Sequence, residues 1–167
     1  MEALLLIDIQ NDYFRGGKFP LAGMEKAAQN ARNILADFRA RGLPVIHIRH
    51  VSLGEGAAFF RQDTAGSEIH ALVAPADGET VLVKHYPNSF RETGLDAKLK
   101  SLGVTTIHVV GAQTNMCVDT TTRAGFDLGY RMVIHERACA ARPFFGTRLI
   151  HRITIKTLGS VFAEIAR

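Results

Sequence analysis

Residues 105–130, TTIHVVGAQTNMCVDTTTRAGFDLGY, pass from an apolar run rich in β-branched residues into a segment with helical features. The run at 105–110 predicts a β-strand, and residues 116–128 predict a helix. A further strand is expected at 132–135, directly after this helix. Strand, helix and strand in this order are typical of a unit whose two strands lie parallel in one sheet.

The same alternation extends over the rest of the chain. Residues 3–7, ALLLI, are apolar at every position, which indicates a strand buried on both faces of a parallel sheet. Right-handed crossovers then predict an α/β fold with a mostly parallel sheet of about six strands. Besides the unit above, we expect strands at 3–7, 45–48, 80–83 and 161–165, and helices at about 27–41, 94–102 and around 149–153.

One long segment, residues 51–77, shows no convincing period. It contains two adjacent aromatic residues, Phe59 and Phe60. A long irregular insertion in a compact domain is more often functional than idle, so we expect this segment to help shape a binding pocket.

Length, composition and charge pattern predict a single-domain protein that neither spans a membrane nor binds nucleic acid. A chain of 167 residues with 47% hydrophobic content predicts one domain spanning residues 1–167. The apolar run at 3–7 is too short to cross a membrane and does not resemble a signal peptide. Two cysteines and no targeting segment favour the cytoplasm. The 20 lysines and arginines are scattered along the sequence, so no nucleic-acid partner is expected.

Polar residues gather where the predicted strands end. Ligands of open parallel sheets bind outside the carboxyl ends of the strands. The candidates there are Asp8, His50, Lys84, His85, Cys117 and Cys139. Three of them form a workable catalytic set: Cys117 as nucleophile, Asp8 as the base that takes the thiol proton, and Lys84 as the charge that holds both.

Each of these residues also has a structural interpretation. Asp8 and Lys84 could form an ion pair without a catalytic role, and Cys117 could simply fill space in the core. The catalytic interpretation gains support because Asp8 and Lys84 both lie where burial is expected. A buried charge is costly, so a position of this kind is more readily explained by a function.

The segments LLLIDIQNDYF, VLVKHYPNSF and GAQTNMCVDTTTRAGFDLGY, in this order, resemble the isochorismatase-like cysteine hydrolases, which include nicotinamidases and related amidases. The resemblance covers nearly the whole chain. It implies a three-layer α/β/α sandwich around a Rossmann-like sheet, and a triad of Cys117, Asp8 and Lys84. It also implies a cis peptide bond between Ala112 and Gln113, with the N–H groups of Gln113 and Cys117 forming an oxyanion hole.

The resemblance extends to the pocket and the assembly. It implies that Tyr13 lines the substrate pocket, although core packing is an equal alternative, and that the protein is a homo-oligomer, a dimer or tetramer. His50 is the best pocket histidine from its position at a strand end.

No metal is expected, because the nicotinamidase pattern of Asp-x-His is missing and His47, His50 and His70 lack a recognisable ligand spacing. No cofactor is expected.

Cys117 in its full motif favours attack on a carbonyl carbon. The expected reaction is therefore hydrolysis of an amide or carbamoyl C–N bond in a small molecule, through a thioester. Vinyl ether hydrolysis of the isochorismatase type and a catalytically silent binding protein remain alternatives. Redox exchange between Cys117 and Cys139 is disfavoured because they do not form a C-x-x-C motif, and dinucleotide binding because no G-x-G-x-x-G follows residues 3–7.

Overall fold

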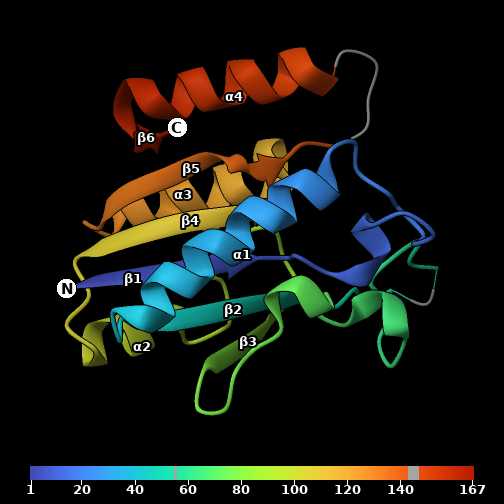
Figure 1. Cartoon of the computed structure of the whole chain (residues 1–167), viewed down its shortest axis with the longest axis horizontal. Coiled ribbons are helices and arrows are strands. Elements are labelled where there is room, and N and C mark those ends of the chain that lie inside the picture. The colour runs from blue at the N-terminus through green and yellow to red at the C-terminus, as the bar shows by residue number, and fades with distance from the viewer. Residues whose placement is uncertain (55, 143–146) are drawn as a thin grey trace.

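The computed structural model describes residues 1–54, 56–142 and 147–167, and its centre is a six-stranded sheet (Figure 1). The strand order is β3-β2-β1-β4-β5-β6, and every neighbouring pair is parallel. The α/β fold expected from the sequence is thereby confirmed. The strands are β1 (Glu2–Ile7), β2 (Val45–His50), β3 (Thr80–Lys84), β4 (Thr106–Ala112), β5 (Arg131–Ala140) and β6 (Glu164–Ala166).

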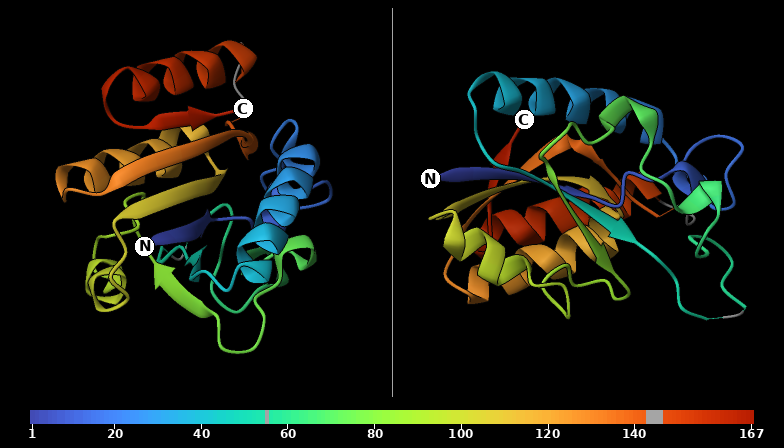
Figure 2. Two further views of the ribbon diagram at one scale, coloured as in Figure 1. Left: turned by 60° about the vertical axis from the view of Figure 1, so that its left-hand side comes forward. Right: turned by 90° about the horizontal axis from the view of Figure 1, so that it is seen from below.

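Helices cover both faces of the sheet, which gives three layers (Figure 2). They are α1 (Met24–Ala40), α2 (Leu95–Ser101), α3 (Asp119–Asp127) and α4 (Thr147–Val161). The chain first runs outward from β1 to β3 and then crosses to β4 on the other side of β1. Because right-handed crossovers that run in opposite directions put their helices on opposite faces, α1 packs in the core of one face, whereas α2 and α4 pack in the core of the other. No helix within the described residues has the length and apolarity of a membrane span.

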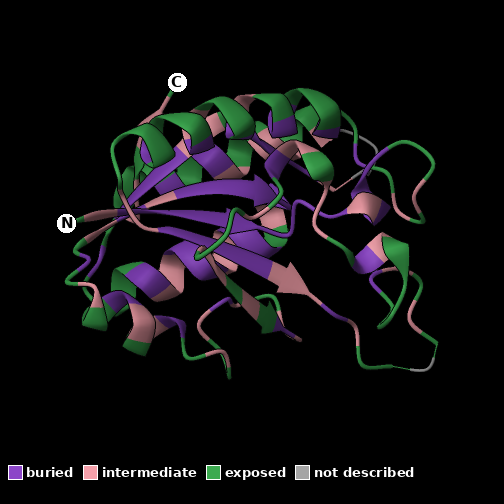
Figure 3. Cartoon of the chain, turned by 60° about the horizontal axis from the view of Figure 1, so that its bottom comes forward, coloured by how far each residue is buried: buried purple, intermediate pink, exposed green. Residues whose placement is uncertain are grey.

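The core consists of two apolar clusters, one on each face of β1. The central strands are accordingly buried along most of their length (Figure 3). Leu4 and Leu6 face α1, whereas Leu5 and Ile7 face the helices of the other side. All four side chains are buried, which explains why this strand is apolar at every position.

Several element boundaries differ from those predicted. The predicted helix at 116–128 is in fact a π-helical turn, η4 (Thr114–Val118), followed by α3. The turn is wide because the Val118 N–H donates to the Gln113 carbonyl, five residues back. The last strand begins only at Glu164, because α4 continues through Val161.

The irregular segment 51–77 is anchored by Asp12. The Asp12 carboxylate accepts hydrogen bonds from the backbone N–H groups of Lys18 (3.0 Å) and Phe60 (2.7 Å). A Cβ atom at Gly66 would collide with the same carboxylate. The described part of the segment contains two short 3₁₀ helices, η2 (Ala65–Ser67) and η3 (Ala71–Val73). Contacts with the buried Asp12 carboxylate, rather than an amphipathic helix or strand, attach it to the domain.

Candidate active site

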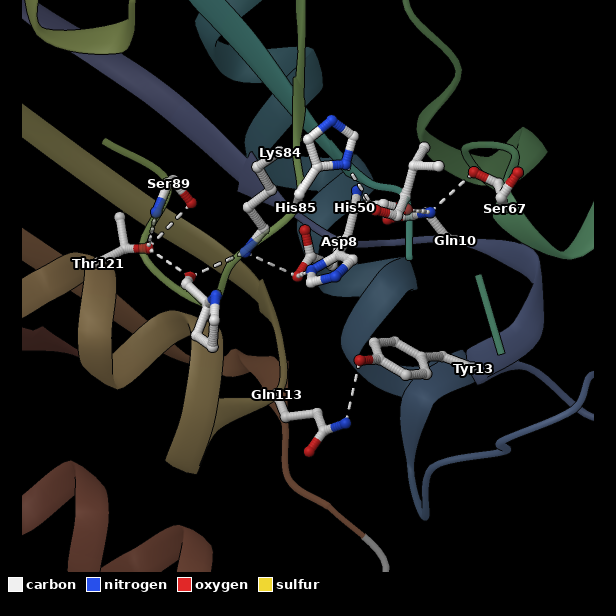
Figure 4. Close-up of polar contacts among 12 residues, drawn as sticks. Asp8, Gln10, Tyr13, His50, Ser67, Lys84, His85, Ser89, Gln113 and Thr121 are labelled. Atoms are coloured by element: carbon white, nitrogen blue, oxygen red, sulfur yellow. Dashed lines mark hydrogen bonds and ion pairs between the residues drawn. The ribbon is translucent and has the colours of Figure 1, made fainter. Parts of the chain in front are cut away.

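Asp8 and Lys84 meet at the carboxyl ends of β1 and β3 (Figure 4). Lys84 Nζ lies 2.9 Å from Asp8 Oδ2, and both side chains are fully buried. Asp8 has a left-handed backbone with φ of 52°, a conformation rare for residues other than glycine, which ends β1 and redirects the chain. The two charges that interrupt the apolar pattern of the sequence therefore offset each other's burial.

Cys117 lies beside this ion pair, in η4. Its sulfur, an oxygen of Asp8 and a ring nitrogen of His50 all lie within 4.8 Å of one another. The thiol is 6% exposed. The site occupies the point where the strand order reverses, between β1 and β4, which is where parallel sheets bind ligands.

The electrostatics of the cluster keep the thiol protonated when no ligand is bound. Burial and then the Asp8 carboxylate raise the pKa of Cys117 to about 12, although the Lys84 ammonium works in the opposite direction. Burial opposes the charge of Lys84, but Asp8 and Cys117 outweigh it and the pKa of Lys84 is raised. Besides Lys84, the Asp8 carboxylate has His50 Nδ1 at 4.0 Å and the Cys117 thiol as polar neighbours, so it is placed to accept the thiol proton.

Lys84 is held by a network that sequence reasoning missed. Its ammonium also donates to the Pro87 carbonyl at 2.9 Å. Thr121 on α3 accepts from the Ser89 N–H at 3.0 Å and donates to the Ser89 hydroxyl at 2.9 Å, which fixes the loop after β3 (Figure 4). The only sequence signal was the run of threonines at 120–122 in an otherwise ordinary helix.

His50, predicted to line the pocket, is the last residue of β2. Its Nδ1 lies 4.0 Å from Asp8 Oδ2, and burial lowers its pKa more than the carboxylate raises it. Gln10 fixes its backbone, since Gln10 accepts from the His50 N–H at 2.7 Å and donates to the His50 carbonyl at 2.8 Å. Gln10 was a second residue missed in the sequence.

Tyr13 and Gln113 form the opposite side of the site. Gln113 Nε2 donates to the Tyr13 hydroxyl at 3.0 Å, and the peptide bond between Ala112 and Gln113 is cis. The Tyr13 ring packs against Phe60, with centroids 4.5 Å apart, and burial raises its pKa well above the ordinary value. The Tyr13 ring therefore packs in the core, and its hydroxyl contacts the residue that precedes η4, whereas its place in a substrate pocket stays a prediction.

The histidines considered as metal ligands lie in different surroundings. His47 contacts Glu79 at 2.8 Å, and His70 stacks on Phe14. Of the described residues, Asp8, His50 and Cys117 alone form a group compact enough to hold a metal ion. However, the Lys84 ammonium lies 2.9 Å from Asp8 Oδ2 and occupies the side of the carboxylate beside this group, so a cation there would be repelled by Lys84.

Cys139, the second strand-end cysteine, is buried at the end of β5, and burial raises its pKa to about 12. Both cysteines are free thiols. Within the described residues, no cation lowers the pKa of Cys139, whereas the Lys84 ammonium lowers that of Cys117. The two thiols therefore differ in their surroundings rather than in burial.

Comparison with known proteins agrees with this architecture. Residues 2–166 match the model of the isochorismatase domain. The chain is 50% identical over 138 residues to YddQ, an uncharacterized isochorismatase family protein of Bacillus subtilis, with 83% of this chain and 77% of YddQ covered.

Two solved structures extend the likeness to three dimensions. One, from Oleispira antarctica and assigned as an isochorismatase hydrolase, has a TM-score of 0.93 at 42% identity and covers 99% of this chain and 92% of that one. The other, N-carbamoylsarcosine amidase from Thermoplasma acidophilum, has a TM-score of 0.88 at 26% identity and covers 99% and 95% of the two chains. The chain therefore belongs to the isochorismatase family of hydrolases.

Proposed function

We propose that this hydrolase cleaves an amide or carbamoyl C–N bond of a small molecule through a thioester on Cys117. The observation that carries the proposal is the buried cluster itself, in which the Asp8–Lys84 ion pair lies next to the Cys117 thiol. The amidase among its structural relatives supports this reaction class.

In the first half-reaction, Asp8 takes the Cys117 proton as the sulfur attacks the carbonyl carbon. Lys84 holds the Asp8 carboxylate through the ion pair and stabilises the thiolate as it forms. The carbonyl oxygen becomes an oxyanion, which the N–H groups of Gln113 and Cys117 would receive. The tetrahedral intermediate then expels the amine, which leaves with the proton from Asp8, and a thioester remains.

In the second half-reaction, water attacks the thioester carbon and gives its proton to Asp8. The C–S bond breaks, the acid product leaves, and the proton returns from Asp8 to the sulfur. His50 and Tyr13 are proposed to contact the substrate, because both lie at the cluster and neither is needed for the proton balance.

A mass-spectrometric screen of small primary amides, carbamoyl compounds and lactams tests this proposal. The unmodified protein is expected to form an acyl adduct on Cys117 with a substrate, whereas Cys117→Ala forms none. Vinyl ether hydrolysis that persists in Cys117→Ala would instead support the isochorismatase-type reaction. A protein that forms no adduct and turns over no compound would support a silent binding protein.

A further inference from the structure

A cavity outside the proposed catalytic cluster of Asp8, Lys84 and Cys117 lies between α1 and α4. It has a volume of about 1000 Å³, and β5 residues Cys139 and Ala140 contribute to its lining. We call it the α1–α4 groove. Both helices begin toward the same side of the sheet (Figure 1), and the residues at their starts, Gly23 and Thr147, line the groove.

Cations dominate the lining of this groove. Five are present, against one carboxylate from Glu136: Lys26, Arg137, Arg148, Arg152 and Arg167. This excess equals the net charge of +4 of the entire chain, so the rest of the molecule is balanced. Arg167 lies 3.9 Å from Glu136, and within the described residues none of the other four cations has a carboxylate at ion-pair distance.

The helix ends make this arrangement unfavourable without a counter-charge. The N-terminus of a helix carries a partial positive charge, so cations in the first turn are disfavoured there. Arg148 is the second described residue of α4, whose first described turn holds no acid, whereas Lys26 in the first turn of α1 is accompanied by Glu25. The cations that line the groove repel one another, and an anion bound between them would relieve this repulsion.

The groove is also connected to the catalytic turn. His151, one of its lining residues, hydrogen-bonds through Nδ1 to Thr114 Oγ1 at 3.0 Å, and Thr114 is the first residue of η4. Ala140 pairs with Ala112 at the end of β4. The groove therefore lies behind the turn that carries Cys117, separated from the ion pair by this backbone.

We propose that the α1–α4 groove is a binding site for a small polyanion that carries phosphate groups or several carboxylates. The site is distinct from the catalytic cluster, because its cations come from α1, β5, α4 and the C-terminus rather than from the ends of β1 and β3. The occupant contacts the guanidinium groups of α4 from one side and the start of α1 from the other. Planar guanidinium groups suit bidentate contacts to phosphate and carboxylate oxygens.

Isothermal titration calorimetry with tripolyphosphate, and separately with citrate, at 150 mM NaCl tests the proposal. The wild-type protein is expected to bind one equivalent of at least one of them. Arg148→Glu/Arg152→Glu should weaken binding at least about tenfold, because each reversal replaces an attraction with a repulsion. The stronger of the two probes identifies phosphate or carboxylate as the preferred group.

The matched control is Arg61→Glu/Lys98→Glu, which changes the net charge equally at positions outside the groove. It should bind the probe as the wild type does. Equal loss in both double variants would show a response to net charge and overturn the proposal, as would no binding of either probe. Sedimentation velocity is measured in parallel, and a dimer that dissociates in Arg148→Glu/Arg152→Glu would assign the groove to a second copy of the chain instead.

Discussion

The proposed catalytic cluster of Asp8, Lys84 and Cys117 differs from the α1–α4 groove in how its charges are compensated. In the cluster, the charges of Asp8 and Lys84 are fully buried and 2.9 Å apart. In the groove, Arg148 and Arg152 are exposed and have no acidic partner within the described residues. Buried charge must be paired within the fold, whereas water can solvate an exposed cation until a ligand replaces it. In the first region the fold itself supplies the counter-charge, whereas in the second we propose that a bound anion supplies it.

The largest expected effect is on chemistry at the cluster. Cys117→Ala should lower the rate of amide hydrolysis at least roughly 10⁴-fold, because it removes the nucleophile on which the thioester forms. The measurement is turnover of any substrate found in the adduct screen. Cys139→Ala is the matched control, since this thiol is equally buried, and it should retain activity within a few-fold.

The next effect is on the free energy of unfolding, and it compares removal of a buried charge with removal of an exposed one. Asp8→Asn should lower the free energy of unfolding by about 3–5 kcal/mol, because it leaves Lys84 buried without its partner. Arg152→Ala in the groove should change it by no more than about 0.5 kcal/mol. Urea denaturation measures both, and equal losses would contradict the contrast between the two regions.

Alanine substitutions at two glycines compare how tightly the backbone is packed in the two regions. Gly111 has φ of 127°, and a Cβ there would collide with the Ile7 carbonyl oxygen. Gly111→Ala should therefore cost about 3 kcal/mol, the sum of backbone strain and overpacking. Gly23 at the groove has φ of 79° with no atom within 4 Å of a Cβ, so Gly23→Ala should cost only about 1 kcal/mol. Thermal unfolding distinguishes the two.

The last prediction concerns the pH dependence of Cys117 alkylation, measured with iodoacetamide in a Cys139→Ala background. The thiolate is the reactive form, and a pKa of about 12 leaves little thiolate at neutral pH. The rate should therefore rise about tenfold per pH unit from pH 7 to 10 without levelling off. Protein unfolded in urea should instead level off near the ordinary thiol pKa, about 8.5. A plateau near pH 7 in the folded protein would show that Lys84 dominates over burial.

Much of the site could be predicted because buried charge is conspicuous in sequence. Asp8 directly follows five apolar residues and Lys84 follows Val-Leu-Val, so the apolar pattern alone indicates that both charges need partners. Gln10, Ser89 and Thr121 were missed because polar residues are common after strands and in helices. Their roles depend on contacts with residues 32 to 57 positions away along the chain. The predicted homo-oligomer stays a prediction.

The sequence by itself determined the order of strands and helices, and with it the parallel sheet, because continuous apolar runs and helical spacing are local properties of the chain. It also determined which charges need partners. Only the tertiary structure decided where the dispersed basic residues lie. Lys26 and Arg167 are far apart in the sequence, yet both line the groove, because the crossovers bring the starts of α1 and α4 together beside β5. Charge that is scattered along a chain can be concentrated in space, since electrostatic energy depends on distance and not on sequence separation.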